Sequence, residues 1–390
     1  MNAPLRQALA RLSRLSTLLV AGALGMTVCA GASSAASATA PASASSFTSG
    51  LKNPWGMAFL PDGRILVTQK AGALVIVSAD GKSVGAPVGA VPAVDSAGQG
   101  GLLDVALDPD FATDPWVYLS FSEPGKGTDD GKSGTAVLRG RLVGNALQDG
   151  VVIFRQLPKV SGRGHYGSRL VFRGDKTLFV TLGERQKGSP AQDLSTHLGK
   201  VVRINRDGSV PAGNPSLGAG ARPEIWSYGH RNSQGAALHP TTGELWELEH
   251  GPQGGDEINI ARAAGNYGWP LRSYGCNYGD RVGEACRIGG GTHAPQFVEP
   301  VTYWVPTSIA PSGLAFYTGA MFPEWRGNLF VGALSGQALW RVVLNGDKVV
   351  SREPLFQSLG ERIRNVTQGP DGALYLLTDS ASGRIIRVAR

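Results

Sequence analysis

A histidine flanked by glycines, His165, is well suited to proton transfer. It lies in the stretch GRGHYG, residues 162–167, where the glycines let the backbone approach a ligand. An imidazole takes up a proton near neutral pH, so His165 is a candidate general base. Taken alone, the residue fits an ordinary exposed histidine in a turn equally well.

The same stretch matches the G-x-G-x-x-G pattern of dinucleotide-binding loops, and Glu184 follows 17 residues after its last glycine. That pattern binds phosphates only where a strand leads into it and a helix follows, because the helix N-terminus supplies the donors. Here Pro158 interrupts the upstream segment, and residues 168–184 have the pattern of a strand, a polar turn and a second strand. The sequence therefore does not favour a dinucleotide site.

Anion-binding side chains occur together in SYGHRNSQG, residues 227–235. His230, Arg231 and Asn232 stand side by side there. A guanidinium offers a fixed fork of donors to a carboxylate or an oxyanion, and an asparagine adds a neutral donor. This segment predicts contact with a negatively charged group.

Oxygen ligands for a hard cation occur in EHGPQGGDEINI, residues 249–260. The carbonyl groups of Gly251 and Pro252 can turn outward, and Asp256 and Glu257 follow closely. Such oxygens suit Ca²⁺. A loop of solvated acidic residues is the alternative interpretation.

Two further arginines, Arg362 and Arg364, lie two positions apart in ERIRN, so on a strand they point to the same side. Together with Arg231 they predict a site for a small polyanion, and a solvated strand face is the alternative. Gln99, in GQGGLLD, adds a polar side chain to this set.

The elements that must position these residues come from a repeated unit. Segments with a small or apolar start, a tight polar turn and an apolar strand begin at residues 54, 101, 168, 233, 311 and 363. The Asp-Gly-like turns are typical of hairpins, and spacings of about 47 to 78 residues suit four-stranded blades with insertions. With 55 glycines and 24 prolines, the chain is predicted to be all-β. We expect a six-bladed β-propeller, because a pair of β-sandwiches would give no reason for six similar units.

In a propeller the loops that join successive blades meet at the mouth of the central channel, so residues far apart in sequence can share one site. We therefore expect the histidine, the arginines and the glutamine named above to lie together. The longest insertion, residues 261–310, should form a layer of loops over one face.

The N-terminal segment has a different composition. Residues 1–35 contain three arginines followed by an apolar run, as in a secretory signal peptide, and residues 36–50 resemble an Ala/Ser-rich linker. The propeller is then expected over residues 51–390, in the periplasm or outside the cell, with a retained membrane anchor as the alternative. Loss of the three arginines lowers the formal charge from +7 to +4, which gives no reason to expect a nucleic-acid partner.

Two cysteines, Cys276 and Cys286, remain beyond the signal segment. In an exported protein such a close pair favours a disulfide that closes the intervening loop. Two separate free thiols are the alternative.

Across residues 50–389 the chain resembles the soluble pyrroloquinoline-quinone-dependent glucose dehydrogenase family, and especially its aldose sugar dehydrogenase branch. The resemblance rests on motifs in a fixed order: GQGGLLD, HYGSRLVF, LGERQ, AQDLSTHLGK, GHRN, EHGPQGGDEIN, GNYGWP, RIRN and GPDGALYLLTD. It implies a six-bladed propeller that binds pyrroloquinoline quinone (PQQ) and Ca²⁺ at the channel mouth.

The resemblance also implies roles for individual residues. His165 would accept the proton of the sugar C1 hydroxyl, and Arg231 would stabilise the developing oxyanion. Ca²⁺ would bind the carbonyls of Gly251 and Pro252. The remaining cofactor contacts implied are Gln99, Asn232, Tyr278, Ala333, Leu334, Ser335, Arg362 and Arg364. A structural Ca²⁺ would lie near Glu257 and the carbonyl of Tyr267. Ser335 departs from the family, because many relatives carry a lysine there, so one cation is missing from the expected anion site.

The function implied is oxidation of the C1 hydroxyl of aldoses to lactones, with electrons passed to an unidentified acceptor by a monomer or homodimer. Two alternatives stay open at this level. One is a sorbosone-type aldehyde substrate, and the other is a calcium-binding propeller without quinone, either a lactonase or a carbohydrate-binding protein.

Overall fold

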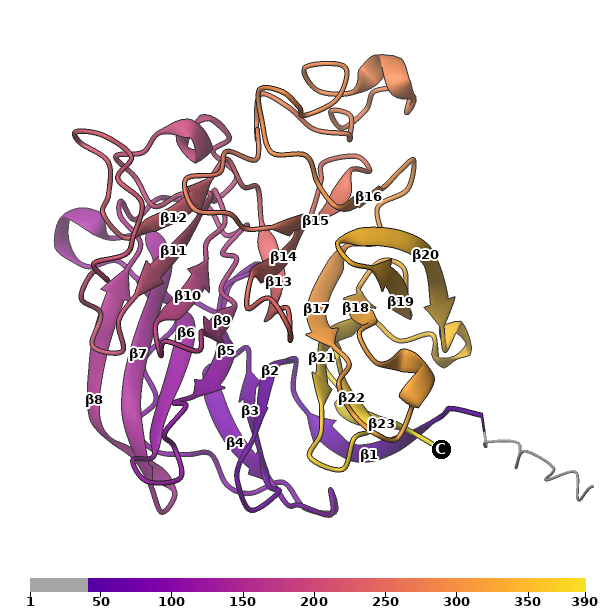
Figure 1. The fold of residues 1–390 in the computed structure, drawn as a ribbon. Coiled ribbons are helices and arrows are strands. Elements are labelled where there is room, and N and C mark those ends of the chain that lie inside the picture. The colour runs from indigo at the N-terminus through magenta and orange to yellow at the C-terminus, as the bar shows by residue number, and fades with distance from the viewer. Residues whose placement is uncertain (1–40) are drawn as a thin grey trace, which may run out of the picture. The chain divides into compact units, whose positions relative to one another are not determined.

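Short apolar strands that are buried on both faces build this protein. Every residue of Ile65–Gln69, Leu329–Ala333 and Leu374–Thr378 is buried. Such strands need a neighbouring layer on each side, which radially arranged sheets provide. In the computed structural model, which describes residues 41–390, six antiparallel sheets form a six-bladed β-propeller (Figure 1).

The first three strands of each blade, counted outward from the channel, follow chain order. The inner strands are β2 (Pro54–Phe59), β5 (Leu102–Leu107), β9 (Leu170–Phe172), β13 (Ser233–Leu238), β17 (Pro311–Phe316) and β21 (Ile363–Gln368). The second strands are β3 (Ile65–Gln69), β6 (Trp116–Pro124), β10 (Leu178–Thr181), β14 (Leu245–Glu249), β18 (Leu329–Ala333) and β22 (Leu374–Thr378). The third strands are β4 (Ala73–Val77), β7 (Ser133–Val143), β11 (Lys200–Ile204), β15 (Asp256–Ile260), β19 (Ala338–Asn345) and β23 (Gly383–Ala389).

Outer strands complete five of the six blades. They are β8 (Ala146–Arg155), β12 (Ile225–Tyr228), β16 (Thr302–Trp304), β20 (Lys348–Leu355) and β1 (Ser43–Leu51). Five short 3-10 helices lie in the connections: η1 (Gly127–Asp129), η2 (Ser189–Gln192), η3 (Glu284–Cys286), η4 (Pro323–Trp325) and η5 (Gln357–Leu359). The expectation of four-stranded blades is wrong for the first blade, since its sheet contains only β2, β3 and β4 within the described residues.

The hydrophobic core lies between neighbouring blades. The inner strands contact one another around a closed ring. Six apolar clusters fill the wedges between adjacent sheets, for example one that joins Leu66 of β3 to Leu119 of β6. The ring therefore holds six inner-strand ends around one axis, and these ends carry the polar residues described below.

Strand β1 closes the ring from the opposite end of the chain. It pairs antiparallel with β23, for instance Ser46 with Ile386, although the sequence analysis placed residues 36–50 in a linker. That boundary is wrong for residues 43–50. β1 is the outer strand of its blade and most of its residues are not buried, so it lacks the apolar alternation typical of a half-buried strand.

The insertion at residues 261–310 projects as loops beyond β14 and β15, and its C-terminal part supplies β16 (Figure 1). The predicted signal peptide, residues 1–35, lies outside the described residues. Among residues 41–390 there is no helix with the length and apolarity required to cross a membrane.

Candidate functional site

His165 is held by a carboxylate that sequence reasoning did not assign. Its Nδ1 lies 2.6 Å from Oε1 of Glu184, and both side chains are buried. The other oxygen of Glu184 accepts hydrogen bonds from the backbone amides of Lys187 and Gly188. The backbone amide of His165 donates to Oε1 of Gln99 at 2.7 Å. Within the described residues no protein hydrogen bond reaches Nε2, so this nitrogen is the one available to a substrate.

The loop that carries His165 is packed backbone against backbone. A Cβ added at Gly183 would lie 2.1 Å from the carbonyl oxygen of His165, so only glycine allows this approach. His165 itself has a positive φ of 50°, a strained conformation for a non-glycine residue that is concentrated at functional sites. Arg185 fastens the loop by donating to the carbonyls of Gly162 and Gly164. The glycines of GRGHYG thus serve the placement of the histidine.

The surroundings of His165 favour the neutral imidazole. Burial lowers its pKa below the ordinary value of 6.5, the hydrogen bond with Glu184 raises it, and the positive charge of Arg231 lowers it again, with a net decrease. For Glu184 burial acts to raise the pKa, but the hydrogen bond and charge of His165 and the amide donors prevail and leave the pKa below its usual value. A neutral imidazole oriented by a carboxylate is the arrangement of a general base.

Arg231 and Asn232 lie next to this pair. Nη1 of Arg231 donates to the carbonyls of His250 and Gly251 at 3.0 and 2.8 Å, and Oδ1 of Asn232 accepts from the amide of Gly167 at 3.1 Å. Nε of Arg231 and Nδ2 of Asn232 are buried without a hydrogen-bond partner among the described residues. Buried donors without a partner are costly, which indicates that a ligand supplies the missing acceptors.

A polar cavity of about 420 Å³ brings residues from five blades together. Among its lining residues are Gln99, Leu334, Arg362 and Arg364, all predicted from the sequence. The cavity is also lined by residues that sequence reasoning missed: Asn53, Trp55, Lys70, Gln234, His250 and Asp379. These come from different blades, so their meeting depends on closure of the ring.

The two arginines of ERIRN converge on Asp379. Nη2 of Arg362 lies 2.8 Å from Oδ2 of this carboxylate, and Nη2 of Arg364 lies 3.1 Å from Oδ1. Burial would raise the pKa of Asp379, but the two guanidinium groups hold it below its usual value. Arg364 also donates to Oε1 of Gln234 at 2.6 Å, while its buried Nε has no partner in the described chain. The pair of arginines thus exceeds the single carboxylate by one positive charge.

His250 presents a fixed tautomer to the cavity. Its Nε2 lies 2.7 Å from the carbonyl oxygen of Pro311, so Nε2 carries the proton and Nδ1 is an acceptor. Burial is the main reason why its pKa is lowered to about 3, and the charges of Arg231, Arg364 and His165 lower it further. His250 is therefore neutral and adds no charge to the cavity.

A buried acidic cluster lies beneath Arg231. β14 and β15 pair Glu247 with Asn259 and Glu249 with Glu257, which places all four side chains on one face of the sheet. One ligand atom each from His230, Glu247 and Glu249 lies within 4.8 Å of the others. Oε2 of Glu247, Nδ1 of His230 and Oδ1 of Asn259 are buried without hydrogen-bond partners among residues 41–390.

The electrostatics of this acidic cluster favour a bound cation. Burial and the charge of Glu249 raise the pKa of Glu247 to about 7, and the same two causes raise that of Glu257 well above its usual value. A divalent cation would relieve this repulsion. Glu257 and the carbonyl of Tyr267 were predicted near a structural cation. Glu257 belongs to this cluster, and the ring of Tyr267 stacks on that of His230 with centroids 4.5 Å apart.

Glu247 and Glu249 were missed, although a signal exists. In WELE, residues 246–249, acidic side chains alternate with apolar ones that are buried, so both faces of this strand point into protein. Glu249 also connects the acidic cluster to the segment that carries Arg231 and Asn232, because its Oε2 accepts hydrogen bonds from their backbone amides.

Of the remaining predicted residues, some lie outside the lining of the cavity. Leu334 lines it and accepts a hydrogen bond from Arg362 at 3.3 Å through its carbonyl. Ala333 is buried at the end of β18, and Ser335 is exposed. The carbonyl of Gly251 accepts from Arg231, and its amide donates to Oδ1 of Asp256 at 2.9 Å. Pro252 is buried beside it.

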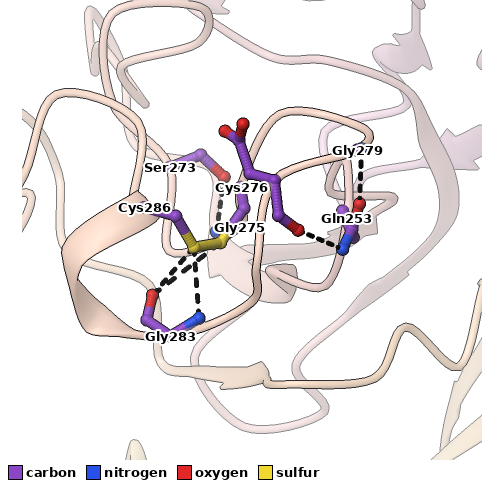
Figure 2. Close-up of a disulfide and its surroundings, with 8 residues drawn as sticks. Gln253, Ser273, Gly275, Cys276, Gly279, Gly283 and Cys286 are labelled. Atoms are coloured by element: carbon purple, nitrogen blue, oxygen red, sulfur yellow. Dashed lines mark hydrogen bonds between the residues drawn. A yellow bond between two sulfur atoms is a disulfide. The ribbon is translucent and has the colours of Figure 1, made fainter.

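Tyr278 belongs to a loop closed by a disulfide. It is 72% exposed, and its hydroxyl accepts a hydrogen bond from Arg231 at 3.3 Å. Cys276 and Cys286 are joined, which confirms the predicted pairing. Figure 2 shows the disulfide beside Gln253, whose side-chain oxygen accepts from the amide of Gly279 at 2.9 Å. The segment that follows Pro252 is thereby tied to the loop that presents Tyr278.

Comparisons with known proteins agree with this geometry. The family model described as Glucose / Sorbosone dehydrogenase matches residues 51–387. The chain is 48% identical over 345 residues to the aldose sugar dehydrogenase YliI of Escherichia coli, covering 87% of this chain and 90% of that protein. It is 30% identical over 410 residues to quinoprotein glucose dehydrogenase B of Acinetobacter calcoaceticus, covering 85% and 84% respectively. The PQQ-bound aldose sugar dehydrogenase of Streptomyces coelicolor superposes with a TM-score of 0.73 at 29% identity, covering 90% of this chain and 98% of that one.

Proposed function

The chain belongs to the Glucose / Sorbosone dehydrogenase family, and we propose that it is a quinoprotein that oxidises the C1 hydroxyl of cyclic aldoses to lactones. The observation that carries this proposal is a neutral, carboxylate-oriented His165 that is hydrogen-bonded to Gln99, a lining residue of a cavity whose cations outnumber its carboxylates.

The cavity fits the quinone on grounds visible in the structure. PQQ carries three carboxylates, and Arg362 and Arg364 share only one carboxylate between them. The unpartnered Nε of Arg364, Nε of Arg231 and Nδ2 of Asn232 are buried donors that an anionic, oxygen-rich ligand would satisfy. Gln99 and Leu334 line the same space. When bound, the quinone would supply a two-electron acceptor for the hydride of the sugar C1 carbon.

The residues of the chain then divide the remaining work. Nε2 of His165 takes the proton of the C1 hydroxyl, while Glu184 holds the opposite ring nitrogen and stabilises the imidazolium that forms. Arg231, fixed by the carbonyls of His250 and Gly251, supplies positive charge to the oxygen as it loses its proton. The C1 hydroxyl oxygen loses its proton and the C1 carbon loses a hydride, so the C1–O group becomes the carbonyl of the lactone.

Calcium is the second cofactor in this proposal, at two places. The acidic cluster offers the carboxylate oxygens of Glu247, Glu249 and Glu257. The pKa values of Glu247 and Glu257 are raised and Oε2 of Glu247 has no hydrogen-bond partner among the described residues, as at a structural cation site. The carbonyls of Gly251 and Pro252 would hold a cation beside the cofactor as a Lewis acid. The Gly251 carbonyl already accepts from Arg231, so the cation would share this oxygen or shift the guanidinium.

We further propose a periplasmic or secreted location, an aldose as substrate and a separate electron acceptor. The exposed side of Tyr278, above Arg231, is a natural contact for the sugar. The site is complete in one chain, so the protein can act as a monomer or as a homodimer.

Reconstitution tests the proposal. The chain purified without cofactor is mixed with PQQ and Ca²⁺, and dye reduction is followed with a panel of aldoses and with sorbosone. Turnover of aldoses that needs both additions supports the proposal, and the lactone is identified in the product. Turnover of sorbosone alone would show that the substrate is a sorbosone-type aldehyde and not an aldose. Failure to bind PQQ would sink the quinoprotein assignment and leave a calcium-binding propeller.

A further inference from the structure

Lys70 is a cation of the cavity that no motif in the sequence singles out. It follows β3 directly, at the turn into β4, and it lines the cavity together with Arg362, Arg364 and Asp379. Its backbone is fixed on both sides, because its amide donates to Asn53 at 3.0 Å and its carbonyl accepts from Leu102 at 3.0 Å. The residue is thus held at the inner end of the first blade.

The ammonium group of Lys70 has unused hydrogen-bonding capacity. It donates to the carbonyl of Gly98, and no other acceptor bonds it within the described residues. An ammonium has three donors, so two remain. Burial lowers the pKa of Lys70, the charge of Asp379 raises it and the charge of Arg364 lowers it, and all three residues line the same cavity.

The charges that line the cavity do not balance. Three cations, Lys70, Arg362 and Arg364, line the cavity with a single carboxylate, Asp379. Lys70 comes from the first blade, whereas the other three charged groups come from the last blade. An anion placed between them would be held from two sides.

Lys70 also supplies a positive charge where the sequence lacks one. Ser335 stands where many relatives carry a lysine, and in this structure Ser335 is exposed and is not among the residues that line the cavity. Lys70 brings a primary ammonium into the same cavity from a different blade.

We propose that Lys70 binds a carboxylate of the quinone cofactor and supplies the third positive charge of the site, in place of the charge absent at position 335. This inference rests on the proposed function. It names a residue on the first blade as part of the anion-binding set, and it predicts that binding energy comes from both sides of the cavity.

Equilibrium binding tests the inference without turnover. PQQ is titrated into the cofactor-free protein with Ca²⁺ present, and the dissociation constant is read from quenching of tryptophan fluorescence at low and high salt. Because a charge-assisted hydrogen bond is lost, Lys70→Met should weaken binding by about tenfold to a hundredfold at low salt. The deficit should shrink at high salt, since a screened charge matters less. Lys70→Arg should restore most of the affinity.

Lys82→Met is the matched control, since it removes the same charge from a side chain that is 83% exposed and outside the cavity. It should leave the dissociation constant unchanged. If Lys70 only anchored Gly98, Lys70→Met would weaken PQQ binding equally at both salt concentrations and would lower the melting temperature. That result would overturn the inference. If Lys70→Met bound PQQ as tightly as the wild type, the inference would be overturned and the proposed function would stand. Absence of PQQ binding by the wild type would remove both.

Discussion

Nδ1 of His165 lies 2.6 Å from Oε1 of Glu184, and Glu184 is itself held by the backbone amides of Lys187 and Gly188. The imidazole is therefore oriented by a carboxylate that cannot rotate freely. This relationship separates the nitrogen that is held from the nitrogen that can receive a proton, and it underlies the first two predictions.

His165→Ala should reduce dye-linked turnover by at least about a hundredfold, because the proton acceptor is removed. The dissociation constant for PQQ should change little, since the cations that hold the carboxylates are intact. Steady-state kinetics and fluorescence titration check these two outcomes. Unchanged turnover would refute the assignment of His165 as the base.

Glu184→Gln should alter the pH dependence as well as the rate. The base must be neutral, so kcat/KM falls as pH decreases through the pKa of His165, which lies below 6.5 in the wild type. The Glu184 carboxylate raises that pKa, so its removal should move the acidic limb to lower pH. The plateau should fall by roughly tenfold or more, because the imidazole loses its orientation and basicity.

A matched control for this change is Glu224→Gln. Glu224 contacts a different histidine, His197, at 3.3 Å and lies outside the cavity. Its substitution should leave the pH profile in place. An acidic limb at the same pH in Glu184→Gln and the wild type would contradict the role given to Glu184.

Arg364→Met should weaken PQQ binding by about tenfold or more through loss of a charge-assisted contact. It should also reduce the free energy of unfolding by about 1–3 kcal/mol, because Asp379 and Gln234 lose a buried partner. Fluorescence titration and urea denaturation measure the two effects. Arg384→Met, which breaks an ion pair with Glu361 outside the cavity, should leave PQQ affinity unchanged. Equal affinities for all three proteins would contradict the anion site.

Added Ca²⁺ should stabilise the cofactor-free protein, by about 2.7 kcal/mol at a concentration one hundred times the dissociation constant. Glu257→Gln should abolish most of this gain, and its metal-free form should be at least as stable as the wild type because like-charge repulsion is relieved. Thermal unfolding with Ca²⁺ or with a chelator measures the stabilisation by Ca²⁺ and the stability of the metal-free form. Glu244→Gln is the control, since Glu244 forms an ion pair with Arg262 at the surface. Full stabilisation of Glu257→Gln by Ca²⁺ would show that the cation binds elsewhere.

Replacement of both Cys276 and Cys286 by serine should make the loop between them more sensitive to proteolysis. The disulfide closes a segment with a sequence separation of 10, for which loop-closure entropy predicts a loss of about 2–3 kcal/mol. Limited proteolysis followed by mass spectrometry locates the cleavage. Wild-type protein treated with a reductant should be cleaved at the same sites, and resistance of both forms would show that Gln253 and the surrounding backbone hold the loop unaided.

The architecture and many site residues could be predicted from the sequence because they depend on local patterns. Tight turns before apolar strands repeat six times, and the ring of blades follows from that repetition. β1 was missed because SASSFTSGL is mostly unburied and its partner, β23, lies at the other end of the chain. An outer strand of this kind carries no apolar alternation that local reasoning could detect.

Partners of the predicted residues were harder to find, because they depend on the closure of loops and blades. Glu184 meets His165 only after β9 and β10 fold back as a hairpin. Asp379 and Lys70 face each other only once the last blade adjoins the first. The positions of Glu184, Asp379 and Lys70 relative to the predicted residues thus depend on tertiary contacts rather than on spacing in the sequence.

The pairing of β1 with β23 has a consequence for how this protein is made. The strand that closes the ring is among the first described residues of the chain, and its partner is the last strand of the described residues. The ring can close only after β1 and β23, which lie far apart in the sequence, have both been synthesised. Lys70 and Asp379 then come within reach of one another, so competence to bind the cofactor arises at the final step of assembly rather than blade by blade.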